Sequence, residues 1–262
     1  MNWIQQIQHH RQSQISQGGQ DGIIDFIFKN VPPKNTKPYY VEFGFNNTTG
    51  ANANTTLLRN NGWEGLLLDG DNSNPELNLH AHYLSSTNVC DLFKQYNVPL
   101  EPEYVSIDVD STDLWLFKAI AKKYKPMLFS VEYNCNFPIT DAITFIDDVE
   151  ASTLRANSNW PRIYGASLKA LNMVAEEAGY TLIAIEPVLD AFFIRNDLIE
   201  GLEKPPLEDF SEYNYPFMNT HDPNTDKSLI KYFMDYEHFL KTNDVIASIE
   251  VAADSSIQHL IK

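Results

Sequence analysis

The chain has 262 residues, of which 43% are hydrophobic and 21% charged, so it can bury a sizeable core and lacks the composition of a disordered protein. Its formal net charge of -16 would repel phosphate backbones over most of the surface, which argues against a nucleic-acid substrate. No apolar run approaches the ~20 residues of a membrane-spanning helix.

Residues 1–18 contain no acidic residue and one arginine, and we interpret them as a leader that forms a short amphipathic helix, with organelle targeting as the alternative. Cys90 and Cys135 stand far apart, which fits a reducing compartment. His80 and His82 alternate without an evident third ligand, so we predict no metal site. We therefore expect an intracellular protein, in the cytoplasm or, if the leader is a targeting signal, in the mitochondrion.

Short apolar runs typical of strands alternate with helical patterns along most of the chain. In chain order the prediction is helix 20–30, strand 39–43, helix 55–61, strand 65–69, short helix 75–83, strand 104–108, helix 113–123, strand 127–133, helix 166–178, strand 180–186 and strand 191–195. Such alternation predicts a parallel sheet with helices on both faces.

The last two predicted strands are separated by too few residues for a crossover helix, so they should be antiparallel neighbours. A mostly parallel sheet with an antiparallel last strand is typical of class I methyltransferases, whereas NAD-binding Rossmann sheets usually lack that strand. We therefore expect an α/β protein with a Rossmann-like class I methyltransferase fold and a seven-stranded sheet.

Acidic and glycine residues follow the predicted strands at the edge where open α/β sheets bind ligands. They are Glu42 and Gly44, Asp69 and Gly70, Asp108 and Asp110, and Glu132, which Asn134 follows. A strongly negative edge suits the sulfonium and ammonium of S-adenosylmethionine, and the G-x-G-x-x-G loop that holds a pyrophosphate is absent. Asp69 stands at the spacing of an acid that binds ribose hydroxyls. The alternative is that these acids end strands only because the next residue is solvated.

The segments "YVEFG", "GWEGLLLDGD", "EPEYVSIDVDSTDLWLFKAI" and "VEYNCNFP" resemble, in order and spacing, FkbM-like S-adenosylmethionine-dependent methyltransferases, and the likeness covers about residues 18–236. The resemblance implies that Glu42, Gly44, Asp69 and Asp108 line the cofactor pocket, with Asn88 and Val89 near the adenine. It also implies O-methylation of a hydroxyl.

Two departures from the family pattern concern the same pocket. The loop after Gly44 carries Asn46 and its polar neighbours where the family has an acid and a glycine, and Ser111 stands where glycine is common. Asn and Thr can still turn the chain and donate hydrogen bonds, so we count Asn46 among the cofactor-binding candidates. A pocket that has closed is the alternative.

Methyl transfer to a hydroxyl requires a base within hydrogen-bond reach of the acceptor. Asp110, Glu132 and Asn134 are the catalytic candidates by position, and the acceptor we expect is a small molecule or a glycan.

The domain prediction has three parts, which are the leader 1–18, a methyltransferase-like domain 19–200 and an aromatic and helical extension 201–262. Isoleucine and leucine recur at near-helical spacing within residues 245–261, and such a face must be buried on this chain or on another. The second functional hypothesis is therefore an inactive methyltransferase-fold accessory subunit that binds a protein partner through residues 245–261.

Overall fold

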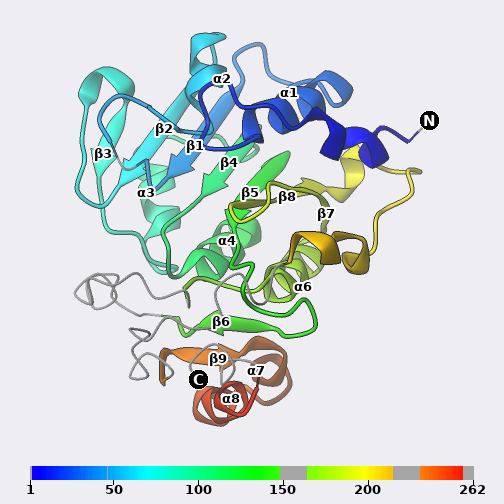
Figure 1. Ribbon diagram of the computed structural model, residues 1–262. Coiled ribbons are helices and arrows are strands. Elements are labelled where there is room, and N and C mark those ends of the chain that lie inside the picture. Colours follow the sequence, from blue (N-terminus) through cyan, green and yellow to red (C-terminus); the bar gives the residue numbers. More distant parts are fainter. Residues whose placement is uncertain (1, 46, 148–163, 215–230, 256–262) are drawn as a thin grey trace.

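The computed structural model describes residues 2–45, 47–147, 164–214 and 231–255, and their centre is a seven-stranded sheet of order β3-β2-β1-β4-β5-β8-β7 (Figure 1). Its strands are β1 (Tyr39–Phe43), β2 (Glu64–Asp69), β3 (Leu79–Ala81), β4 (Tyr104–Ile107), β5 (Leu128–Glu132), β7 (Tyr180–Ile185) and β8 (Asp190–Arg195). Strand β8 pairs antiparallel with both β5 and β7, and the other pairs are parallel. The predicted fold class is confirmed, and β1 lies between β2 and β4 as expected.

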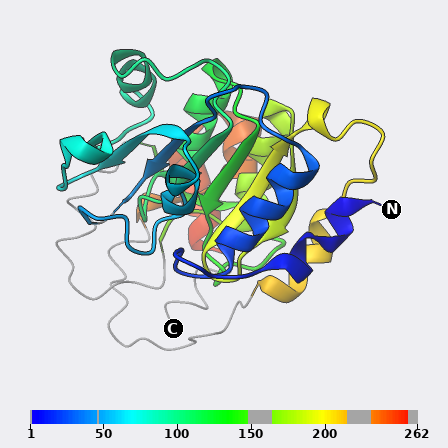
Figure 2. The same cartoon turned by 90° about the horizontal axis from the view of Figure 1, so that it is seen from above.

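Helices cover both faces of the sheet because alternate strand residues point to opposite sides. Val41 and Phe43 join a core with α3 (Val89–Gln95), α4 (Asp113–Lys123) and α6 (Leu168–Ala178). Tyr40 joins a second core with η1 (Trp3–His10), α1 (Gln20–Asn30) and α2 (Thr56–Asn60). Figure 2 shows η1 and α1 side by side along the β7 and β8 end of the sheet. The predicted leader thus forms a short helix whose Ile4 and Ile7 are buried in the second core.

A small second sheet lies beside α4 and α6 (Figure 1). Strand β6 (Ile143–Phe145) pairs antiparallel with β9 (Phe233–Asp235), which α7 (Tyr236–Thr242) and α8 (Val245–Ala253) follow. Trp115 of α4 donates its indole N–H to the Phe145 carbonyl at 2.7 Å, which connects α4 to the second sheet. Among the described residues, none of the helices combines the length and the apolar character that a bilayer span requires.

The predicted helix over 75–83 is wrong. Only η2 (Pro75–Leu77) is helical there, because Asn78 adopts a left-handed conformation with φ 54° and stops the turn. Leu79 then pairs with Leu67, and the segment becomes β3, the edge strand that completes the sheet. Within the described ranges the chain also forms the short helices η3 (Asn196–Leu198) and η4 (Leu207–Tyr213).

Gly44 allows the ends of β1 and β4 to approach each other closely. Its φ is +66°, and a Cβ atom there would lie 1.7 Å from the Asp108 carbonyl oxygen, whereas a Cβ atom at Gly62, with φ +87°, would have nothing within 4 Å.

We predict that Gly44→Ala lowers the free energy of unfolding by at least ~3 kcal/mol, against ~1 to 2 kcal/mol for the control Gly62→Ala, which adds backbone strain alone. Urea denaturation measures both, and equal losses would contradict the steric explanation.

Candidate active site

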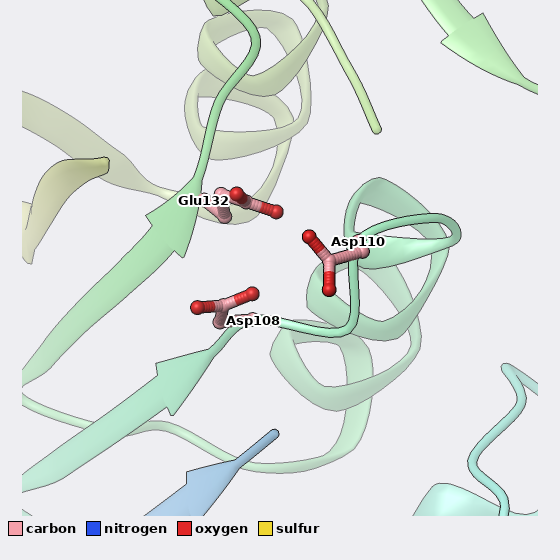
Figure 3. A group of neighbouring side chains, drawn as sticks. All are labelled: Asp108, Asp110 and Glu132. Atoms are coloured by element: carbon pink, nitrogen blue, oxygen red, sulfur yellow. The ribbon is translucent and has the colours of Figure 1, made fainter. Parts of the chain in front are cut away.

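The parallel strands β1, β2, β4 and β5 end at one edge of the sheet, and the predicted site residues follow them there. Three of these residues come together. Asp108, Asp110 and Glu132 each offer a carboxyl oxygen, and these oxygens all lie within 4.8 Å of one another. Figure 3 shows Asp108 and Glu132 at the ends of two neighbouring strands and Asp110 on the turn that follows, with the carboxyl groups facing one another.

The turn after β4 places the Asp110 carboxyl in this group. Asp110 has φ +59°, a left-handed conformation that aspartate tolerates better than most residues. Asp113, at the start of α4, holds the turn because its carboxylate accepts the backbone N–H groups of Val109 at 2.8 Å and Ser111 at 2.9 Å. The left-handed residue is Asp110, so Ser111 fits where glycine is common in the resembling family.

Burial raises the pKa of Asp108 well above its ordinary value, and the neighbouring charges of Asp110 and Asp113 raise it further. Burial also raises the pKa of Glu132, and the next largest cause is Asp108. Like charges at this distance cannot all ionise in a poorly solvated place without a cation nearby.

Glu42 uses both carboxyl oxygens to hold the loop that leads into α2. Its Oε1 accepts the Asn54 backbone N–H at 2.8 Å, and its Oε2 accepts the Thr55 backbone N–H at 3.1 Å and the Thr55 hydroxyl. The residue was predicted to line a cofactor pocket. In the structure its described contacts shape the loop that would border such a pocket.

Asp69 closes a turn at the end of β2. Its Oδ1 accepts the backbone N–H groups of Asp71 and Asn72 at 2.8 and 2.9 Å and the Asn72 side-chain amide at 2.9 Å. Gly70 lies under Tyr83, whose ring would be 3.1 Å from a Cβ at that position.

The other predicted site residues have structural contacts of their own. The Asn88 side chain accepts the Ser85 N–H at 2.9 Å and donates to the Tyr83 carbonyl at 2.8 Å. Val89 is fully buried in the core, and Asn46 lies outside the described residues. Asn134 is also fully buried. Its side-chain oxygen accepts two N–H groups of Asn136, and its amide donates to the Tyr164 carbonyl. A cofactor or catalytic role for these residues stays a prediction.

Asn47 organises the polar loop after Gly44, which the sequence marked only by its Asn, Thr and Gly content. Its Oδ1 accepts the backbone N–H groups of Thr49 at 2.8 Å and Gly50 at 2.7 Å. Its amide donates to the carbonyls of Phe45 and Ala51 at 3.0 and 2.9 Å. The Asn47 side chain thus holds the loop closed through hydrogen bonds to the loop backbone.

Asp190, the first residue of β8, is a buried acid that is not among the site residues predicted from the sequence. It pairs in register with Glu132 of β5. Its Oδ2 accepts the side-chain amides of Gln20 at 2.9 Å and Asn54 at 3.1 Å. An acid inside the apolar run "VLDAFF" was the available signal.

No protein-family model and no curated protein sequence matches this chain. Similar solved structures include an O-methyltransferase family protein from Burkholderia thailandensis, with 10% identity and a TM-score of 0.37, covering 67% of this chain and 58% of that one. A second is the CMeT domain of the citrinin polyketide synthase, with 11% identity and a TM-score of 0.33, covering 74% of this chain and 52% of that one. A third is the CurJ carbon methyltransferase, with 11% identity and a TM-score of 0.35, covering 67% of this chain and 52% of that one. The matches span little more than half of each of those chains.

We predict that stability depends on pH through Glu42. Burial raises its pKa from 4.5 to about 7, although the donors from Thr55 and Asn54 oppose the shift. An acid whose pKa is raised on folding stabilises least when ionised, so its contribution is lost as pH rises from 4.5 to about 7. The unfolding free energy of the wild type relative to Glu42→Gln should therefore fall by up to ~3 kcal/mol over this range.

Urea denaturation across that pH range measures the difference. Glu76→Gln, at an exposed position of η2, is the matched control, and its difference from the wild type should stay constant. A constant difference for Glu42→Gln as well would show that the Glu42 carboxyl keeps its ordinary pKa.

Proposed function

We propose that this protein is an S-adenosylmethionine-dependent methyltransferase that methylates a hydroxyl group of a small molecule or glycan. The observation that carries the proposal is the sheet order with β8 antiparallel, combined with acids that follow β2, β4 and β5 at one edge. Ligands of open α/β sheets bind at that edge. The FkbM-like sequence blocks support the same proposal. The choice of a hydroxyl as the methyl acceptor rests on that resemblance.

The residues at this edge fit the cofactor. The acids Asp108, Asp110 and Glu132 give a negative environment for its sulfonium and ammonium groups, and Asp69 stands at the end of β2, which pairs with β1. The close approach of Gly44 to Asp108 leaves no side chain between the ends of β1 and β4. When bound, the cofactor supplies an electrophilic methyl group.

The chain's own part in the reaction is to place the acceptor and take its proton. A carboxyl oxygen of Asp110 or Glu132 would accept the proton of the acceptor hydroxyl. These side chains stand where β4 and β5 end, at the edge of the sheet proposed to bind the cofactor. Asn134 would be a positioning residue, because its side chain hydrogen-bonds the backbone of Tyr164 and Asn136.

The direct test is calorimetric titration of the purified protein with S-adenosylmethionine and with S-adenosylhomocysteine. Saturable binding of both ligands is the expected result. Absence of binding at millimolar ligand would overturn the proposal.

We predict that Asp69→Asn weakens binding of S-adenosylhomocysteine by ~1.5 to 3 kcal/mol, which is ~10-fold to 150-fold in the dissociation constant. Asparagine retains the Oδ1 acceptor that closes the turn with Asp71 and Asn72, and it replaces Oδ2, the candidate acceptor of the ribose hydroxyls, by a donor. Asp71→Asn removes the same charge two residues away and should change the affinity less than ~2-fold. Equal affinities of both variants and the wild type would remove Asp69 from the pocket.

The second candidate function is an inactive methyltransferase-fold subunit of a larger assembly. Ile246 of α8 is 72% exposed, and its neighbours Val245 and Val251 and Leu240 of α7 are exposed as well. Exposed apolar side chains grouped on two adjacent helices favour a protein contact there. Two results together would favour this function. The protein would bind no cofactor, and it would be recovered in a stoichiometric complex with a partner protein that the Ile246→Asp variant no longer forms.

A further inference from the structure

We propose that Asp108, Asp110 and Glu132 form a binding site for a divalent cation that prefers oxygen ligands, such as Mg²⁺ or Mn²⁺. The site goes beyond the proposed function, because the chain would bind the ion whether or not it binds a cofactor. The spacing of the histidines and cysteines predicts no metal site in this chain.

The separations of the three carboxyl oxygens suit one shared ion. Two oxygens that bind the same Mg²⁺ or Ca²⁺ at ~2.1 to 2.5 Å lie no more than ~4 to 5 Å apart. The oxygens of the three side chains all lie within 4.8 Å of one another. They come from the end of β4, the turn before α4 and the end of β5, so two paired strands and a helix start hold them in place.

A second observation points to a ligand at the centre of this group. Glu132 is only 8% exposed, and its Oε2 is buried without a hydrogen-bond partner among the described residues. Figure 3 shows its carboxyl directed toward Asp108 and Asp110. A buried carboxyl oxygen without a donor is costly, and a cation between the three side chains would satisfy it.

The kind of ion follows from the ligand set. The site offers carboxylates alone, without histidine or cysteine, and such oxygen ligands suit Mg²⁺, Mn²⁺ and Ca²⁺ better than Zn²⁺ or Cu²⁺. Asp108 and Asp110 are partly exposed, so a hydrated ion can reach the site from solvent and keep water molecules as further ligands. With an ion bound, Asp110 and Glu132 would act first as its ligands.

The experiment is a titration of the full chain with Mn²⁺, followed by the loss of the electron paramagnetic resonance signal of the free ion. One saturable site, from which excess Mg²⁺ or Ca²⁺ displaces Mn²⁺, is expected in the wild type. Asp110→Asn and Glu132→Gln should each weaken binding by tenfold or more. Asp91→Asn removes one charge from an exposed position of α3 and should change binding less than twofold.

Absence of saturable Mn²⁺ binding in the wild type would overturn the site, and so would an Asp110→Asn variant that binds as the wild type does. Asparagine tolerates the left-handed conformation of residue 110, so this variant keeps the test valid if Glu132→Gln fails to fold. Cofactor titration of the same samples separates the two proposals. A protein that binds Mn²⁺ but not S-adenosylmethionine would support the metal site alone, and one that binds only S-adenosylmethionine would support the proposed function alone.

Discussion

The Glu42 carboxyl group holds together the edge of the sheet on which the candidate site depends. It binds the backbone of Asn54 and Thr55 and so folds the loop after β1 back onto the strand ends. That fold brings the Asn54 amide to Ser106 of β4 and to Asp190 of β8, which also binds Gln20 of α1. One buried acid therefore connects three strands, a loop and a helix, and its removal would loosen all of them.

The acids at this edge divide into two groups by the partners that the fold supplies. Glu42, Asp113 and Asp190 are buried and accept hydrogen bonds from N–H donors of the backbone or of amide side chains. In the cluster of Asp108, Asp110 and Glu132, the carboxyls face one another instead. The first group shapes the site, and the second concentrates negative charge at the place proposed for a cationic ligand.

The sheet could be predicted because its strands are buried on both faces and alternate with helices, a pattern carried by each segment alone. The prediction failed at 75–83, where Asn78 in a left-handed conformation ends the helical turn and pairing with β2 makes the next residues a strand. It also omitted β6 and β9, since strands of three residues are too short to show a period, and their pairing joins segments far apart in the chain.

The sequence by itself determined which residues follow the strands, because an apolar run and the polar residue that ends it are local features. It therefore placed Glu42, Asp69, Asp108 and Glu132 at one edge of a mostly parallel sheet. Only the tertiary structure decided what each acid does there. The pairing of β4 with β5 brings Asp108 near Glu132, and the left-handed backbone at residue 110 turns a third carboxyl toward them. The donors from Asn54 and Thr55 meanwhile occupy Glu42, so contacts between distant segments distinguish this structural acid from the acids of the proposed cation site.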